Sequence, residues 1–199
     1  MKKMLVTPLL VALFVSVCSG FDNNRKGFVL GVGAGLAPLS QFSSKAIKEN
    51  EPALGFNFII GHGLDNRNIV AFEINITYRD SDYYSEIGRR TSKRFDFFNI
   101  DTLGPFHGSQ TITQGFLGVS WYHYFSPLPK APFTVVGVGR YSLTPKSLRG
   151  PDSGFGFLIG GGRGLSRHIQ IAGYYSHGQS GYGALKHDQV SVLISYIAY

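Results

Sequence analysis

One segment of this sequence contains the three residue types of a serine hydrolase. Ser180 follows His177 closely, and Asp188 lies a short distance beyond both. A serine acts as a nucleophile when a histidine base lies within hydrogen-bond reach and a carboxylate orients that base. His177, Ser180 and Asp188 therefore form a candidate catalytic set. A Gly/Ser/His loop with no chemistry is the alternative interpretation of the same residues.

Two isolated charges suggest a second site. Glu73 and Arg140 each lie in a stretch of alternating apolar residues. A charge buried in such a stretch is costly unless it is paired, so we predict that the two form an ion pair inside the fold. The pair would either fill the interior of the fold or gate an ion path through it.

A basic run lies in a polar region between two apolar stretches. It consists of Arg89, Arg90, Lys93 and Arg94. Lysine and arginine side chains recognise phosphate groups at a lipid surface. Acidic residues in the same region balance the run, so a solvated loop is the alternative interpretation.

Other kinds of chemistry find no support in the sequence. The single cysteine, Cys18, excludes a disulfide framework and a cysteine-based zinc site, and no motif implies another metal or a cofactor. The glycines of 31–35 lack the spacing and the following helix of a phosphate-binding loop. The formal charge is +7, or +5 without Lys2 and Lys3, which does not indicate nucleic-acid binding.

The first twenty residues resemble an export signal. Lys2 and Lys3 precede an apolar stretch that ends in the small residues Ser19 and Gly20. This pattern predicts a secretory signal peptide over 1–20 and one domain over 21–199. Acylation of Cys18, as in lipoproteins, is the alternative to its loss with the signal.

The remainder alternates with period two, which indicates strands. In 70–79, for example, Val70 and Phe72 lie on one face and Glu73 and Asn75 on the other. Eight such segments are predicted, at 28–36, 55–64, 70–79, 110–125, 133–141, 154–165, 169–175 and 189–199. The facing of 133–141 is ambiguous, because both of its faces carry valines.

The connections between these segments alternate in length. Long connections are predicted at 38–54, 80–109, 142–153 and 176–188, and short ones at 65–68, 126–132 and 166–167. An up-and-down barrel places alternate connections at opposite ends, and outer-membrane barrels have short periplasmic turns and long outer loops. The fold class predicted is therefore an all-β, eight-stranded antiparallel up-and-down transmembrane β-barrel.

The distribution of residue sizes favours a membrane over water. The bulky apolar face lies opposite a face of glycines and small polar residues, which suits a narrow, filled interior surrounded by lipid. A soluble lipocalin-type barrel, with its apolar residues inside, is the alternative. We also expect a girdle of aromatic residues at the membrane surfaces, formed by Phe28, Tyr78, Trp121, Phe125, Phe133, Tyr141, Tyr175 and Tyr196.

Together with the aromatic Tyr199 at the end of the last segment, these features resemble the small outer-membrane β-barrel superfamily of the OmpA-transmembrane, OmpX and OmpW kind. The resemblance covers about 26–199. It implies an outer-membrane location, insertion by the barrel-insertion machinery, and contact with outer-membrane lipids and lipopolysaccharide through Arg89, Arg90, Lys93 and Arg94.

Three functions remain open. A structural or interaction role through the outer loops, without catalysis, is the first. Some eight-stranded barrels are PagL-like lipid A deacylases, and His177, Ser180 and Asp188 resemble their set. That family, however, has one residue between His and Ser, and this chain has two. The third is a small channel for apolar solutes.

Overall fold

The described residues of this computed structural model form eight antiparallel strands. They comprise residues 25–43, 48–81, 110–144, 153–180 and 185–199. The strands are β1 (Gly27–Ser43), β2 (Lys48–Gly63), β3 (Asn68–Ser81), β4 (Gln110–Tyr124), β5 (Pro132–Thr144), β6 (Ser153–Gly164), β7 (Ile169–Ser180) and β8 (Leu185–Ala198). The predicted signal peptide and the basic run lie outside the described residues.

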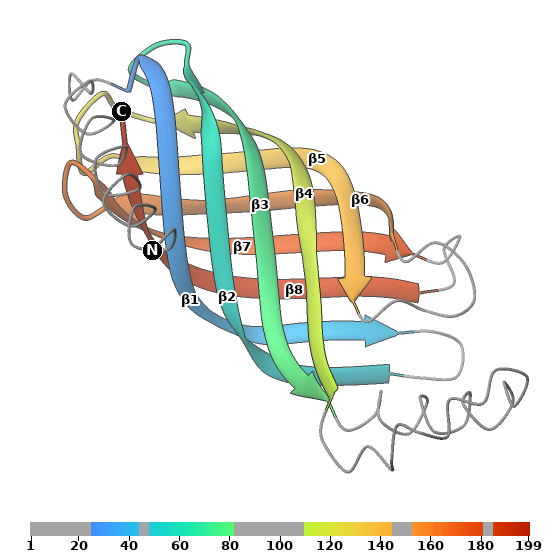
Figure 1. The fold of residues 1–199 in the computed structure, drawn as a ribbon. Coiled ribbons are helices and arrows are strands. Elements are labelled where there is room, and N and C mark those ends of the chain that lie inside the picture. The colour runs from blue at the N-terminus through green and yellow to red at the C-terminus, as the bar shows by residue number, and fades with distance from the viewer. Residues whose placement is uncertain (1–24, 44–47, 82–109, 145–152, 181–184) are drawn as a thin grey trace, which may run out of the picture.

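Each strand pairs with the next, and β8 pairs with β1, so the sheet closes into a barrel (Figure 1). Closure gives every strand two neighbours, which a lipid environment requires. The predicted fold class is therefore confirmed. No helix in the described ranges is long and apolar enough to cross a membrane.

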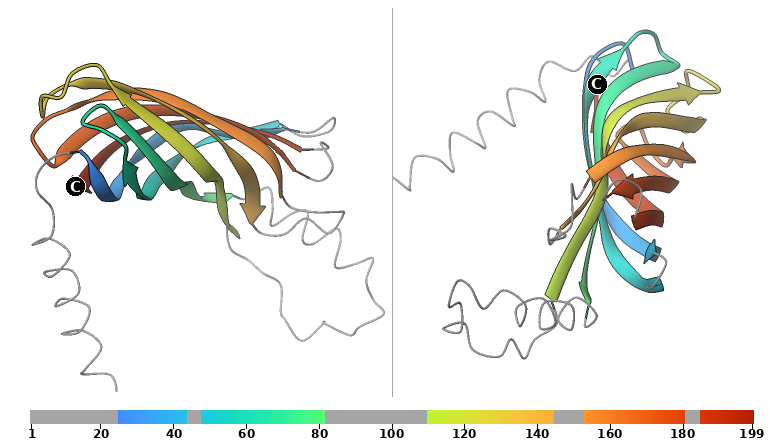
Figure 2. Two further views of the ribbon diagram at one scale, coloured as in Figure 1. Left: turned by 90° about the horizontal axis from the view of Figure 1, so that it is seen from above. Right: turned by 90° about the vertical axis from the view of Figure 1, so that its right-hand side faces the viewer.

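The strands are tilted, as Figures 1 and 2 show. Residues that are paired on neighbouring strands can be followed once around the barrel. The row of partners begins at Leu30 of β1 and comes back to β1 at Gln41, beyond the bulge between Leu36 and Leu39. The row runs through Leu30, Ile60, Phe72, Val119, Val138, Phe157, His177, Asp188 and Gln41. Leu30 lies near the start of β1 and Gln41 near its end. The row therefore moves along the barrel axis from strand to strand, and its members on β7 and β8 lie close to the end of the barrel where β1 ends.

Three turns lie at the opposite end from the other four connections. Long connections were predicted at 38–54 and 176–188, but only 44–47 and 181–184 remain between the strands, so these two predictions were wrong. The β2–β3, β4–β5 and β6–β7 turns gather with the C-terminal end of β8 at one end of the barrel (Figure 1). We call this the turn end and the other the loop end. If the chain enters an outer membrane in the usual way, the turn end is periplasmic and the loop end faces outward.

The exterior is apolar and the interior is filled. Phe28, Leu36, Val138 and Phe155 are at least half exposed, and large apolar side chains cover all eight strands in the same way. Such a surface is stable in lipid and not in water, where exposed patches of this size are rare. The apolar side chains face outward, which is the reverse of the soluble lipocalin-type alternative.

Most of the predicted girdle faces outward, but two members do not. Phe133 and Tyr141 of β5 point inward and are buried, whereas Thr134 and Arg140 face outward. Inward-facing Phe133 packs against the rings of Tyr122 and Tyr124, so interior volume decided the facing of this ambiguous strand. The prediction that these two rings join the girdle was wrong.

Four strands extend at least four residues further than predicted at the loop end. At the loop end β1 continues to Ser43, β2 begins at Lys48, β7 continues to Ser180 and β8 begins at Leu185. The apolar alternation stops near the membrane surface, but the backbone hydrogen bonds of a hairpin do not depend on it. His177, which was expected in a connection, therefore lies on a strand.

Candidate functional site

The interior of the barrel has an apolar layer toward the turn end. Val29, Ile59, Ile69 and Phe133 contribute buried side chains to it, and Tyr122 and Tyr124 add their rings. These residues come from β1, β2, β3, β4 and β5, so they converge from a large part of the wall. An eight-stranded barrel leaves room only for side chains, and here aromatic and branched residues occupy this layer.

A polar network begins next to this layer. Glu73 is fully buried, and its Oε2 accepts a 2.8 Å hydrogen bond from the hydroxyl of Tyr122. Across the barrel, Ser195 donates to Oδ1 of Asn57 at 3.1 Å, and Nδ2 of Asn57 donates to the hydroxyl of Tyr174. These bonds join β2, β3, β4, β7 and β8 through the interior.

A second set of polar contacts lies further toward the loop end. The hydroxyl of Tyr141 donates to Oε1 of Gln189 at 2.9 Å, and Nε2 of Gln189 donates to Asn75. Beyond them Arg79 forms an ion pair with Glu51, with Nη1 and Oε2 2.9 Å apart. The described interior is thus crossed by side-chain contacts at several heights.

The predicted pair of Glu73 and Arg140 is not brought together. Glu73 faces inward, but Arg140 is exposed on the outside and pairs in register with Leu117 and Phe155, which also face outward. The sequence could not decide the facing of β5, since both of its faces carry valines. The hydroxyl of Tyr122 takes the place at Glu73 that we predicted for the guanidinium.

The predicted catalytic residues are brought together in part. His177 and Asp188 are direct partners on β7 and β8, with Nδ1 and Oδ1 2.9 Å apart. The hydroxyl of Tyr175 donates to the same carboxylate oxygen at 2.6 Å. All three side chains are partly exposed on the outer face near the loop end.

The geometry between His177 and Asp188 is that of an oriented base. A carboxylate oxygen only accepts, so Nδ1 of the imidazole carries the shared hydrogen, and Nε2 makes no hydrogen bond with the residues that the structure describes. The ring of Phe157 packs beside the imidazole, with centroids 5.4 Å apart. Carboxylate and aromatic ring together hold the imidazole in one orientation.

The hydroxyl required for nucleophilic catalysis is not placed by the structure. Ser180 pairs with Leu185 at the end of β7, and its side chain lies outside the described part. Gln179, two residues after His177 and exposed, is the next residue on the same face. Tyr175, which the sequence analysis missed as a site residue, was detectable in principle from its two-residue spacing to His177.

A second group of contacts closes the turn end. Arg25 is buried just before β1, and its guanidinium donates to the carbonyl oxygens of Asn66, Ser126, Leu128 and Pro129. Its Cζ lies 3.8 Å from the ring centroid of Tyr124. One cation thus joins the β2–β3 turn to the β4–β5 turn.

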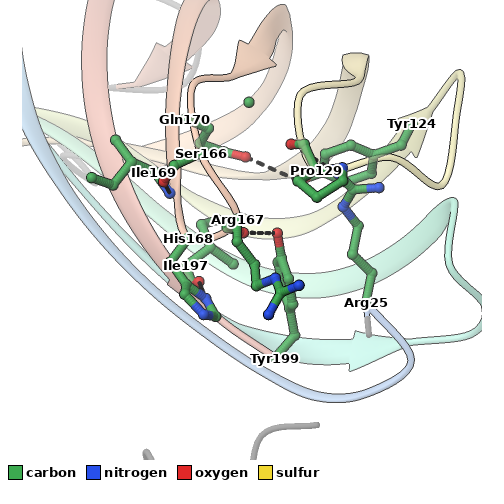
Figure 3. Close-up of a pocket in the computed structure, with 11 residues that line it drawn as sticks. Arg25, Tyr124, Pro129, Ser166, Arg167, His168, Ile169, Gln170, Ile197 and Tyr199 are labelled. Carbon is green, nitrogen blue, oxygen red and sulfur yellow. Dashed lines mark hydrogen bonds between the residues drawn. The ribbon is translucent and has the colours of Figure 1, made fainter. Parts of the chain in front are cut away.

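Arg25 borders a small pocket at this end (Figure 3). Across it the hydroxyl of Tyr199 donates to the backbone oxygen of Arg167, in the β6–β7 turn. Tyr199 is buried, as are Ser191 and Ser195 on the same face of the chain. The contacts of Arg25 and Tyr199 hold the turns and the C-terminal residue together at the turn end. The described residues that line this pocket include no hydrogen-bonded pair of an acid and a base.

Neither site holds an evident metal centre. In the ranges that the structure describes, no three His, Cys, Asp or Glu side chains are grouped to bind a metal ion.

Comparison with known proteins identifies the architecture. No protein-family model matches the chain, and no curated protein matches its sequence. The crystal structure of Ail, the attachment invasion locus protein of Yersinia pestis, in complex with the heparin analogue sucrose octasulfate is similar, with a TM-score of 0.54 and 12% identity. The match covers 86% of this chain and 99% of Ail.

Ail without that ligand gives a TM-score of 0.51 at the same identity and coverage. Neisserial surface protein A gives 0.49 at 11% identity, over 86% of this chain and 97% of its own. At these identities the likeness concerns the fold. The apolar exterior is the feature of this chain that suits a membrane. The chain therefore has the fold of the small eight-stranded outer-membrane β-barrels.

Proposed function

We propose that this barrel is an anchor that presents its outer loops to phosphorylated partners at the cell surface, above all lipopolysaccharide, and that it is not a conduit. The filled interior carries this proposal. An apolar layer and several side-chain hydrogen bonds cross the described lumen, among them the bond from the hydroxyl of Tyr141 on β5 to Gln189 on β8. A barrel filled in this way offers its surface, rather than a channel, to other molecules.

The basic run is the proposed contact. Arg89, Arg90, Lys93 and Arg94 lie in the sequence between β3 and β4, and the ends of these two strands that the sequence joins are at the loop end. Arginine recognises phosphate and sulfate oxygens through paired N–H donors. Ail, of similar fold, was crystallised with a polysulfated ligand, which is consistent with polyanion binding on this kind of scaffold.

The test replaces all four basic residues with glutamine and measures lipopolysaccharide binding by the refolded protein. We expect affinity to fall at least about tenfold, because several charge-assisted contacts are lost. The matched control removes four exposed cations at the turn end, Lys26, Lys130, Arg163 and Arg167. Equal weakening in both variants would show a general charge effect and would refute the loop contact.

A channel for solutes makes a different prediction. Liposomes that contain the protein should swell in an isotonic solute if the lumen conducts. We expect no swelling above protein-free liposomes, because the interior side chains leave no open column.

A lipid A deacylase is a second candidate, favoured by the contact between His177 and Asp188 on the outer face. Lipid A from cells with the protein, without it, and with Ser180→Ala should then be compared by mass spectrometry. Our proposal expects identical acyl chains in all three. Loss of an acyl chain that requires Ser180 would establish the enzyme instead.

A further inference from the structure

A cluster of charges lies on the outer face of β5 to β8, apart from the proposed loop contact. Arg140 on β5, His177 on β7, and Lys186 and Asp188 on β8 all face outward. The tilt of the strands brings the β7 and β8 members to the loop end of the apolar surface. Charged side chains at a lipid boundary are costly and are functional candidates by default.

The cluster has an excess of positive charge. Asp188 is engaged by His177 and by the hydroxyl of Tyr175. Arg140 and Lys186 make no hydrogen bond or ion pair with any residue that the structure describes. The unmatched charge is cationic, so the complementary ligand is an anion.

Aromatic side chains lie between these charges. Phe155 is the register partner of Arg140, and Phe157 is the partner of His177. Phe155 is 68% exposed, and the rings of Tyr175 and His177 pack against Phe157. The outer face thus offers an apolar patch bordered by cations, which suits a ligand with an acyl chain and an anionic head.

We propose that this face binds the phosphate of a lipid A molecule in the outer leaflet. Arg140 holds the phosphate, and an acyl chain rests on Phe155 and Phe157. His177 presents Nε2 toward the headgroup, since its Nδ1 is occupied by Asp188. The site contains none of the four loop residues and is independent of the proposed loop contact.

The experiment uses the full-length mature chain folded in detergent micelles. Two probes are compared, lipid A with both phosphates and lipid A with both removed. Native mass spectrometry measures the fraction of protein that carries each lipid. The variants are Arg140→Gln, His177→Gln and, as the matched control, Arg163→Gln, an outward-facing arginine near the turn end.

The wild-type protein should prefer phosphorylated lipid A. Arg140→Gln should weaken that binding about tenfold, which corresponds to one charge-assisted contact, and Arg163→Gln should leave it unchanged. His177→Gln should weaken it less. Each variant must retain the gel mobility of the folded barrel before boiling.

Two outcomes would overturn the site. Equal retention of both lipids by the wild type would show that phosphate is not recognised. Undiminished binding by Arg140→Gln would place any recognition elsewhere. The fourfold loop variant separates the two proposals. If only that variant loses binding of phosphorylated lipid A, the loop contact is supported and the proposed site on the outer face of β5 to β8 is refuted.

Discussion

Gly178 shows how a single residue shapes the interior. A Cβ at this position would overlap the Cβ and Cγ atoms of Tyr141, whose ring lies in the space that the glycine leaves. The ring of Tyr141 also stacks on that of His187, with centroids 5.1 Å apart, and its hydroxyl reaches Gln189. The ring of Tyr141 can therefore occupy this position only because Gly178 of β7 has no side chain.

Gly178→Ala should destabilise the barrel by about 1–3 kcal/mol, because overpacking displaces the ring of Tyr141. Urea unfolding in lipid vesicles, followed through the fluorescence of the single tryptophan, Trp121, measures the change. Gly173→Ala on the same strand is the control, since its nearest neighbour lies 4.0 Å from the added Cβ. Equal stability of the two variants would contradict this account of the interior.

At the scale of elements, the turns depend on a residue outside them. Arg25 makes four hydrogen bonds to carbonyl oxygens of two turns that are distant in sequence. A guanidinium reaches several acceptors at once because its donors form a fixed fork. An ammonium presents only a point charge and cannot reproduce that arrangement.

We expect Arg25→Ala to lower the free energy of unfolding by about 2–4 kcal/mol, since four turn carbonyls lose a charged donor and Tyr124 loses its cation. Arg25→Lys should recover only part of this. The same urea titration reports the change, and Lys26→Ala, at an exposed neighbour, should have little effect. Full recovery by lysine would show that charge alone matters.

The β2–β3 turn gives a pH-dependent prediction. Oδ1 of Asp65 accepts hydrogen bonds from the backbone N–H groups of Arg67 and Asn68, and Oδ2 accepts one from the side chain of Asn68. These bonds, with that from the Asn68 side chain contributing most, lower the pKa of Asp65 below its ordinary value. The ionised form is therefore favoured in the folded barrel.

The stabilisation from Asp65 should be complete above the ordinary aspartate pKa of about 3.9 and should be lost as pH falls through the lower folded-state pKa. Comparison of the wild type with Asp65→Asn between pH 7 and pH 2 measures it. The difference in unfolding free energy should shrink toward acid. A difference that grows as pH falls would contradict the sign of the shift.

At the scale of the whole molecule, closure and an apolar exterior determine behaviour in detergent. Every strand has two neighbours, so no edge is available to start unfolding. We expect the protein in the outer-membrane fraction to migrate differently in a gel before and after boiling, because detergent alone does not open the barrel. Soluble periplasmic protein with no shift would refute the membrane assignment.

The sequence by itself determined the number of strands and the faces of most strands. Those features follow from local alternation, as in 70–79, and from the positions of turn residues. A period of two in side-chain direction is a property of each strand alone.

Only the tertiary structure decided the facing of β5 and the partners of the charged residues. Valines on both faces left Arg140 undetermined, and the packing of Phe133 and Tyr141 turned Arg140 outward, away from Glu73. The pairing of His177 with Asp188 arose from the register of β7 and β8 beyond the apolar segments. Contacts of this kind depend on barrel closure, register and interior volume, which no single segment encodes.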